Sequence, residues 1–378
     1  MNTDIKLCQI ITQTHFGGAQ KYICDIVNHL SDDFDITIAY GDGEETELSS
    51  HIHKNVKFIK LKRLQRSINP FQDILAIFEL FLFFKKNHFN VIHLHSSKAG
   101  FIGSISGKLA GISKIIYTAH GWVFKEDLSF LKKSIYILLE KIAAKFKTKI
   151  ICVSKQDYDL AISKHIAPKN KLELIYNGIN NINFIEKDGA RKILFEKFKI
   201  EDTGQKLIGT IANFYKNKGL KYFIEAADIL NKKNNNTIFF IIGDGIERKN
   251  LEELIIKNNL KNFFLLGYIK EDANTLLRAF DIFVLASIKE GLPYTLLESL
   301  NASNLIVSSN LESLTEIIEN NVNGVIFEAK NSNDLASKID LLLTNKELAL
   351  KLTENSSLSL EKFDFQNFIN KIKENYSS

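Results

Sequence analysis

Short apolar runs alternate along the chain with longer segments in which apolar residues recur at helical spacing. The apolar runs of the first half span residues 5–11, 35–40, 56–61, 91–95, 114–118, 149–153 and 172–176. Helical spacing follows several of these runs, in residues 22–30 and in segments that begin at Phe71, Lys98 and about Ser129. Such alternation predicts β-α-β units and therefore a largely parallel sheet with helices on both faces.

A second series of the same kind begins near residue 207. Its expected strands are residues 207–212, 237–242, 263–266, 281–285 and 304–308. A polar stretch rich in Asn and Lys separates the two series, and we expect residues 181–205 to be a linker. The chain is thus expected to be an α/β protein of two doubly wound, Rossmann-like domains, residues 1–180 and 206–378, which face each other across a cleft. We leave open that the last helix packs back on the N-terminal domain.

The composition is that of an ordinary globular enzyme. Hydrophobic residues make up 45% and charged residues 25% of the 378 positions. The longest apolar run, residues 74–84, is too short to span a bilayer and contains Glu79. Cys8, Cys24 and Cys152 lack metal-ligand spacing, so reduced thiols are expected. Because the first residues also lack the long apolar core of a signal peptide, we expect a cytoplasmic protein.

Positive charge is concentrated in the N-terminal half. Residues 1–180 carry 24 Lys and Arg against 17 Asp and Glu, and the remaining residues carry 25 against 27. The segment 129–150 interleaves apolar residues with Lys132, Lys133, Lys141, Lys145, Lys147 and Lys149. It is either a helix with a solvated lysine face or, with the apolar helix that ends in Lys85 and Lys86, a surface for anionic lipid headgroups. No nucleic-acid-binding motif accompanies these lysines, so nucleic acid is not expected as a partner.

The stretch from Ser287 to Glu298 predicts a phosphate site. A buried strand, a loop with Gly291 and Pro293, and a helical pattern follow one another, so the free N–H groups of a helix start point outward. Glu290 and Glu298 bracket this start, and carboxylates accept hydrogen bonds from ligand hydroxyls. The alternative is a helix whose acidic first turn favours its own dipole.

Three other loops at expected strand ends suit phosphate. Gly17 and Gly18 lie between the first strand and its helix, where a backbone or a phosphate can approach closely. Lys218 precedes a glycine at a helix start, and Gly243 ends another strand. Neither glycine loop has the full dinucleotide fingerprint, so a nicotinamide site is not expected.

Histidines stand at two further strand ends. His93 and His95 share one face of their strand, but no local signature supplies further metal ligands. A polar strand end with His95, Ser96 and Ser97 facing the cleft is therefore favoured over a metal site. His120 follows the next strand, beside a glycine and the single Trp of the chain, and both a structural and a functional role remain open.

Two Asp-x-Asp triplets have the residue types of a metal-binding pair but not the expected position at the end of a strand. Asp33 and Asp35 precede their strand, and Asp157 and Asp159 fall in a helical stretch, so all four are expected to be exposed charges. A metal-independent mechanism is then expected, in which Lys218 and helix N-termini stabilise a departing diphosphate.

Over nearly its whole length the chain resembles the family-4 retaining glycosyltransferases of the GT-B fold. The matching pieces are residues 17–20, 93–100, 118–121, 153–154, 176–179, 218–219, 243–245 and 290–298. The most specific piece is the last, a Glu-x7-Glu in a strand–loop–helix setting. The sequences of residues 93–100 and 118–121 are similar to those found in bacterial enzymes that build O-antigen, capsule or exopolysaccharide repeat units.

The resemblance implies a role for each matching residue. Glu290 would bind hydroxyls of the donor sugar, Glu298 would hold the ribose, and His120 would lie near the transferred sugar and the acceptor. The implied catalytic residues are His120, Glu290 and Lys218. The implied donor-binding residues are Gly17, Gly18, Lys218, Gly243, Glu290, Gly291, Leu292, Pro293, Tyr294, Thr295 and Glu298. The acceptor-side candidates are His95, Ser96, Ser97 and Lys98.

The resemblance also implies the reaction and its partners. A sugar would pass with retention from a nucleotide donor, expected to be a UDP-sugar, to a polyprenyl-diphosphate-linked saccharide, with no metal and no cofactor. The enzyme would sit peripherally at the cytoplasmic face of the inner membrane and contact anionic lipid. The alternatives are a sugar-nucleotide epimerase of the same fold and a non-catalytic partner subunit.

The chain departs from the family pattern in two loops. The family often has an arginine where this chain has residues 213–216, so Tyr215 and Lys216 are the candidates to replace it beside Lys218. A Gly-Gly pair that is common before a later glutamate is replaced by residues 311–314, which leaves the role of Glu316 open.

Overall fold

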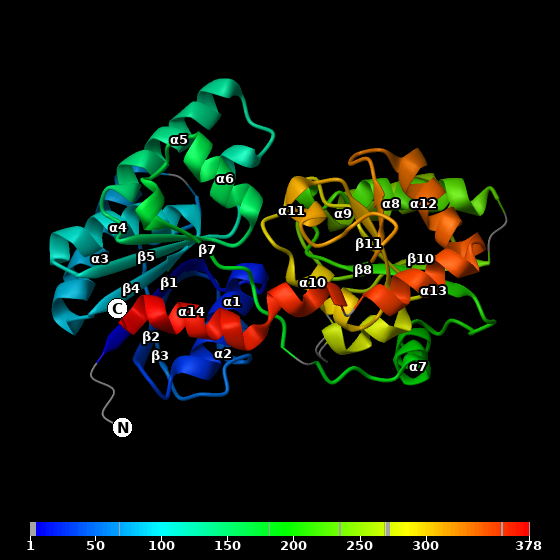
Figure 1. Cartoon of the computed structure of the whole chain (residues 1–378), viewed down its shortest axis with the longest axis horizontal. Coiled ribbons are helices and arrows are strands. Elements are labelled where there is room, and N and C mark those ends of the chain that lie inside the picture. The colour runs from blue at the N-terminus through cyan, green and yellow to red at the C-terminus, as the bar shows by residue number, and fades with distance from the viewer. Residues whose placement is uncertain are drawn as a thin grey trace. The chain divides into compact units, whose positions relative to one another are not determined.

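The computed structural model of the chain describes residues 5–67, 69–180, 182–233, 236–267, 269, 273–356 and 358–377. The structure divides into two compact units. The first consists of Met1–Gly178 with Phe365–Ser378, and the second consists of Ile179–Asp364. Each unit contains one parallel sheet and the helices that cover it (Figure 1). The segment 181–205, expected to be a linker, contributes helix α7 (Lys187–Phe198) to the second unit.

The sheet of the first unit has the strand order β3-β2-β1-β4-β5-β6-β7. Its strands are β1 (Lys6–Gln13), β2 (Asp35–Asp42), β3 (Lys57–Lys60), β4 (Val91–His95), β5 (Lys114–Ala119), β6 (Lys149–Cys152) and β7 (Leu172–Leu174). Its helices are α1 (Gly18–Leu30), α2 (Thr46–Ser49), α3 (Pro70–Asn87), α4 (Ser97–Ala110), α5 (Phe130–Ala144), α6 (Lys155–Ser163) and α14 (Phe365–Ser377), with 3-10 turns at Val123–Lys125 and Lys169–Lys171. All seven apolar runs predicted in this half form strands. Most of the sheet is buried on both faces, which is why its strands are continuous apolar runs.

The sheet of the second unit has the order β10-β9-β8-β11-β12-β13. Its strands are β8 (Lys206–Ile211), β9 (Thr237–Ile242), β10 (Phe263–Leu265), β11 (Ile282–Leu285), β12 (Leu305–Ser309) and β13 (Val325–Phe327). Besides α7, its helices are α8 (Leu220–Asn231), α9 (Arg248–Lys257), α10 (Tyr294–Asn301), α11 (Glu312–Thr315), α12 (Ser332–Thr344) and α13 (Lys346–Asn355), with 3-10 helices at Lys216–Lys218, Ala273–Ala279 and Leu358–Phe363. The five predicted strands are confirmed, and β13 is an additional one. Because β8 and β11 are neighbours, the loops that follow them start from adjacent points of the sheet edge.

Polar side chains interrupt the core of the first sheet at four places. Gln9, His93, His95 and Thr118 lie in its central strands and are fully buried. The rings of His93 and His95 are 4.2 Å apart, which confirms that the two residues share one face of β4. Buried polar groups require hydrogen-bond partners, and these are supplied by one another and by α1 and α14.

Helix α14 follows the second unit in sequence but belongs to the first. The helix lies beside α1 (Figure 1). Its Phe368 packs against Tyr22, and its Phe365 packs against His29. Its Tyr376 is buried, and the carbonyl of that residue accepts a hydrogen bond from Lys114 Nζ at 2.9 Å. An apolar stripe with polar residues opposite is what lets this helix close the sheet face.

Within the described part of the chain, none of the helices combines the length and the apolar character that crossing a bilayer requires.

Candidate active site

Lys218 and Glu290 of the second unit form an ion pair, with Nζ 2.6 Å from Oε1. Lys218 ends the 3-10 helix after β8, and Glu290 lies in the loop after β11, so the adjacency of these strands brings the two side chains together. Ser287 Oγ donates to the same carboxylate oxygen at 2.6 Å. Only 8% of Glu290 is exposed. A nearly buried carboxylate is thus held by a cation and a hydroxyl.

Gly219 allows this approach. Its φ is +63°, and a Cβ there would lie 2.0 Å from the carbonyl oxygen of Ala286 at the end of β11. The amide of Ile288 donates to the carbonyl of Asn217 at 2.8 Å, which ties the two loops together. Only glycine adopts this conformation at this spacing without displacing the backbone.

The helix start predicted as a phosphate site is present. Pro293 has φ −75° and ψ 123° and is the N-cap residue of α10, so the amides at the start of that helix precede its regular hydrogen bonds. Gly291, Leu292 and Tyr294 are buried, and Thr295 is partly exposed. Glu298, in the second turn, is 1% exposed. The phosphate contacts predicted at this helix start are therefore backbone amides around Thr295.

A third loop of this unit contains a cation that sequence reasoning missed. Gly243 has φ +135°, and a Cβ there would lie 2.1 Å from the carbonyl oxygen of Ala212. Arg248 follows and packs its guanidinium over the ring of Phe214, 5.2 Å from the centroid. Arg248 Nε also lies 2.8 Å from Asp244 Oδ1, and this bond lowers the pKa of that carboxyl. An arginine thus contacts the loop of residues 213–216, although it is already paired.

In the first unit, His120 follows β5 and contacts His95. Its Nε2 lies 3.1 Å from His95 Nδ1, and His95 Nε2 lies 2.7 Å from Gln9 Oε1. Burial lowers the pKa of His120 to about 3. Burial and the neighbouring histidines lower the pKa of His95 as well. Both imidazoles are therefore neutral at physiological pH.

The same chain of hydrogen bonds continues to α14 and back to the sheet. Gln9 Nε2 donates to Tyr376 Oη at 2.9 Å, and Tyr376 Oη lies 2.6 Å from His93 Nδ1. His93 Nε2 lies 2.7 Å from Thr118 Oγ1, which donates to Tyr22 Oη at 3.3 Å. The sequence signal that could have indicated this chain of hydrogen bonds was Gln9, a polar residue inside a mostly apolar strand.

The acceptor-side candidates occupy different environments. His95 is fully buried rather than facing outward, so it reaches a ligand only through His120. Ser96 caps α4 with φ +79° and accepts from Thr12 Oγ1 at 3.1 Å. Ser97 hydrogen-bonds to the buried Tyr117. Lys98 Nζ lies 2.5 Å from Asp73 Oδ1, so its charge is already paired.

Gly17 and Gly18 lie where the first β-α loop was expected. Gly17 is the N-cap residue of α1, in an extended conformation that any residue adopts, and Gly18 begins the helix and is exposed. Their backbone is open to a ligand, and both remain predicted donor-binding residues.

Two expectations about surface charges were wrong. Asp157 is buried, because its carboxylate pairs with Lys125 Nζ at 3.0 Å, whereas Asp159 is exposed beside Lys155. The basic segment 129–150 is not one lysine-lined helix. Lys147 lies beyond α5, is buried, and pairs with Glu140 at 3.0 Å, and Lys149 belongs to β6. Among the described residues no three His, Cys, Asp or Glu side chains are grouped to hold a metal ion.

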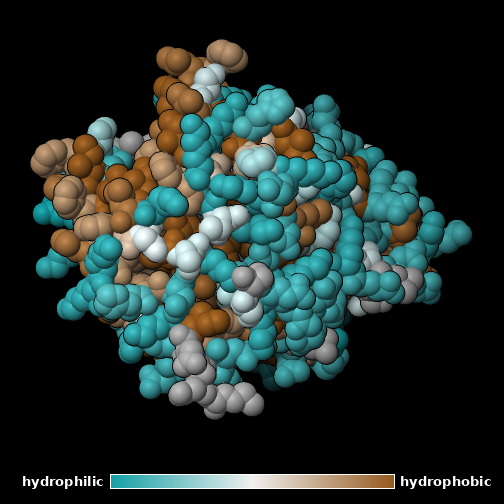
Figure 2. All heavy atoms as spheres, turned by 60° about the vertical axis from the view of Figure 1, so that its left-hand side comes forward, coloured by the Kyte–Doolittle hydropathy of each residue, from teal (hydrophilic) through white to brown (hydrophobic). Residues whose placement is uncertain are grey.

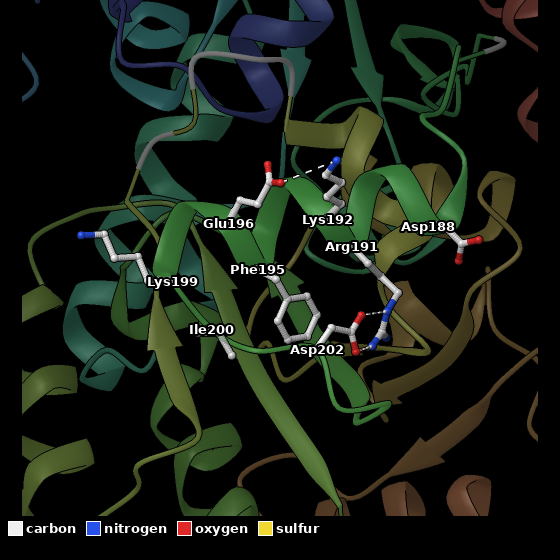
Figure 3. Close-up of a pocket in the computed structure, with 8 residues that line it drawn as sticks. All are labelled: Asp188, Arg191, Lys192, Phe195, Glu196, Lys199, Ile200 and Asp202. Carbon is white, nitrogen blue, oxygen red and sulfur yellow. Dashed lines mark hydrogen bonds and ion pairs between the residues drawn. The ribbon is translucent and has the colours of Figure 1, made fainter.

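A hollow of about 580 Å³ runs along α7 in the second unit (Figure 3). Four of the charged side chains that line it form two ion pairs: Arg191 contacts Asp202 at 2.9 Å, and Lys192 contacts Glu196 at 3.7 Å. None of the predicted site residues lines this hollow.

Both units carry their candidate residues in loops after the carboxyl ends of parallel strands, as nucleotide-binding α/β proteins do. Two family models match the chain. The model described as "Glycosyltransferase Family 4" covers residues 16–181, and "Glycosyl transferases group 1" covers residues 192–358. The chain belongs to the family-4 glycosyltransferases of the GT-B fold, which confirms the predicted fold class and enzyme class.

Named relatives and a solved structure support this assignment. The chain is 26% identical to the UDP-Gal:alpha-D-GlcNAc-diphosphoundecaprenol alpha-1,3-galactosyltransferase of Escherichia coli, covering 99% of this chain and 97% of the relative. It is 29% identical to the N,N'-diacetylbacillosaminyl-diphospho-undecaprenol alpha-1,3-N-acetylgalactosaminyltransferase of Campylobacter jejuni, over 82% of each. The crystal structure of Anabaena Alr3699/HepE in complex with UDP and glucose has a TM-score of 0.84 at 19% identity, covering 99% of this chain and 100% of that one.

Proposed function

We propose that this glycosyltransferase moves a sugar, with retention, from a UDP-sugar to a hydroxyl of a polyprenyl-diphosphate-linked saccharide during surface-polysaccharide assembly. The observation that carries the proposal is the similarity, over 99% and 82% of the chain, to two transferases whose names specify undecaprenyl-diphosphate acceptors. The complex of HepE with UDP and glucose supports a UDP-sugar donor.

The second unit has groups suited to the donor. Lys218 and the backbone amides at the start of α10 provide positive charge for a departing diphosphate. Glu290 accepts hydrogen bonds from sugar hydroxyls, and Glu298 holds the ribose. The leaving phosphate oxygen takes the proton of the attacking hydroxyl on the same face of the sugar, so the new bond keeps the configuration of the old one. No step in this proposal requires a metal ion.

A donor screen tests the proposal. Purified enzyme is incubated with individual nucleotide sugars and a synthetic lipid-linked acceptor, and the products are weighed by mass spectrometry. We expect one hexose or N-acetylhexosamine to be added from a UDP-sugar. Conversion of the donor to an isomer without acceptor would instead support an epimerase, and no turnover with any donor would favour a non-catalytic subunit.

A lipid-linked acceptor implies work at a membrane, and two helices of the first unit support this. Four exposed apolar residues at spacings of three or four form a stripe along α3: Phe71, Ile74, Phe78 and Leu82. A second stripe runs along α5: Leu131, Ile135, Leu138 and Ile142. Phe130, 87% exposed, begins α5. Figure 2 shows apolar residues gathered over this side of the molecule. These stripes are termed here the α3–α5 surface.

The exposed charges on α3 and α5 suit anionic lipid. Glu140, the single acid of α5, is buried against Lys147. On α3, Glu79 accepts from two backbone amides at 2.9 and 2.8 Å, and Asp73 pairs with Lys98. The exposed charges that remain are lysines, among them Lys85, Lys86 and Lys132. We therefore propose that the α3–α5 surface inserts apolar side chains among anionic lipids at the cytoplasmic face of the inner membrane.

Vesicle binding tests this surface. Phe78→Gln combined with Leu131→Gln should lower the partition coefficient for phosphatidylglycerol-containing vesicles about tenfold. The matched control is Ile246→Gln with Ile256→Gln, two exposed apolar residues of the second unit. Equal binding of both variants, or a wild-type dimer that Phe78→Gln dissociates, would contradict the proposal. Transfer to a water-soluble acceptor should be unchanged, which separates membrane docking from catalysis.

A further inference from the structure

Seven polar side chains of the first unit form one unbranched chain of hydrogen bonds. In order they are His120, His95, Gln9, Tyr376, His93, Thr118 and Tyr22. Six of them are buried, and His120 at one end is partly exposed. A chain of this kind has a direction, because each neutral hydroxyl or imidazole donates only one hydrogen.

The amide of Gln9 sets that direction. Its Nε2 donates to Tyr376, and its Oε1, which can only accept, faces His95 Nε2. His95 must therefore carry its proton on Nε2. A neutral imidazole has one N–H, so His95 Nδ1 is an acceptor, and His120 must donate to it from Nε2.

The remaining hydrogen bonds, from Tyr376 to Tyr22, are consistent with the direction that Gln9 sets. Tyr376 Oη accepts from Gln9 and gives its own hydrogen to His93 Nδ1. His93 then carries its proton on Nε2 and donates to Thr118, which donates to Tyr22. Each of the six links in the chain thus joins one donor to one acceptor. The burial that lowers the pKa of all three histidines keeps them neutral, as the argument requires.

His120 is consequently left with a lone pair on Nδ1. No residue in the described ranges forms a hydrogen bond with this nitrogen. Its Nε2–H is engaged with His95, so His120 has an acceptor and no donor to offer a ligand. Such a group pairs with a hydroxyl and not with a phosphate oxygen.

We propose that Gln9 and Tyr376 are positioning residues that hold His120 in the Nε2–H tautomer, so that Nδ1 accepts a hydrogen bond from a sugar hydroxyl of the bound substrate. The proposal rests on the glycosyltransferase function proposed above. It makes α14, more than 240 positions from His120 in sequence, part of the support of the site.

The tautomer is measurable without activity. Nitrogen chemical shifts of ¹⁵N-histidine-labelled enzyme distinguish Nε2–H from Nδ1–H, and the His120→Gln variant identifies the signals of His120. We expect Nε2–H for His93, His95 and His120 in the wild type. A proton on Nδ1 of His120 would mean that the chain runs in the opposite direction, and it would overturn the proposal.

Tyr376→Phe tests the positioning step. It keeps the ring, which packs edge-on against Phe34, but removes the acceptor of Gln9 and the donor to His93. The amide of Gln9 is then free to turn, and we expect the His120 signals to become a mixture of both tautomers. The expected kinetic effect is a fall of about tenfold in kcat with little change in the KM for the donor.

The control is Asn375→Ala on the same helix, which removes a 3.2 Å bond to Glu173 outside the chain of seven. It should leave both the tautomer and kcat unchanged. If Tyr376→Phe alters the tautomer but not kcat, the proposed link to the reaction is wrong. If the wild type transfers no sugar from any donor, the proposed function is wrong, and the nitrogen shifts still decide the tautomer.

Discussion

Lys218 Nζ lies 2.6 Å from Glu290 Oε1, so two residues predicted to hold different parts of the donor are bonded to each other. The pair has a clear consequence for binding. A diphosphate that draws Lys218 away releases the carboxylate of Glu290 for hydroxyls of the sugar. We therefore expect binding of the diphosphate and binding of the sugar to be coupled through this ion pair.

Replacing Lys218 by Ala should lower kcat/KM for the donor about 100-fold, because a cation beside the leaving diphosphate is lost. It should also destabilise the fold by roughly 1–3 kcal/mol, since Glu290 is nearly buried and loses its cation. Lys232→Ala, at an exposed lysine of the same unit that pairs with Asp228, is the control. Steady-state kinetics and urea unfolding measure the two effects. Equal losses for both lysines would show that general positive charge, and not the pair, is what matters.

Gly219→Ala should destabilise the second unit by more than about 2 kcal/mol, because the methyl group would meet the Ala286 carbonyl and the φ is positive. Gly204→Ala separates these causes. Gly204 has φ +80°, and no atom lies within 4 Å of the place that a Cβ would take, so its replacement reports backbone strain alone, about 1 kcal/mol. Chemical denaturation of both variants gives the difference, and equal losses would remove the steric argument.

Stability should fall as the pH is lowered from about 6.5 to 4.5. Burial lowers the pKa of His93, His95 and His120, the last to about 3, so the unfolded chain binds protons that the folded chain does not. The stabilisation is complete above the unfolded pKa of about 6.5 and is lost below it, at up to about 1.4 kcal/mol per pH unit for each histidine. His120→Gln should reduce the dependence of the unfolding free energy on pH by the contribution of one histidine, up to about 1.4 kcal/mol per pH unit. Urea titrations at several pH values measure it, and an unchanged slope would count against the burial of His120.

A fragment of residues 5–178 should be poorly folded, because without α14 it exposes Tyr22, His93 and Phe34. The same fragment joined by a short linker to residues 365–377 should unfold cooperatively. Circular dichroism on heating compares the two. Identical transitions would mean that the helix adds nothing to the first unit.

Much of the fold was readable from sequence because strands buried on both faces are continuous apolar runs. All twelve predicted runs became strands, whereas the strand Val325–Phe327 was missed. The amphipathic pattern of α14 predicts a helix with one buried face but not which unit buries it. The ion pair of Lys218 with Glu290 depends on strand order, and strand order is set by tertiary packing.

In the candidate site, too, residues with a local sequence pattern could be predicted, and residues brought together by tertiary packing could not. Glu290 and Pro293 stand in a local strand–loop–helix pattern, so they could be predicted as a site, whereas Gln9 and Tyr376 carry no motif. They matter because folding places them 2.9 Å apart. Asp157 was expected at the surface because an isolated charge usually is, and only its partner Lys125 explains its burial.

The return of α14 to the first unit has a consequence for biosynthesis. A ribosome delivers residues 5–178 first, but the core that they build lacks Tyr376 and Phe368 until the whole second unit has been translated. While the second unit is translated, the face of the nascent first unit that α14 covers is therefore exposed to chaperones or to premature association. Synonymous codons or pauses that alter the rate of translation through residues 179–364 would change how long that exposure lasts.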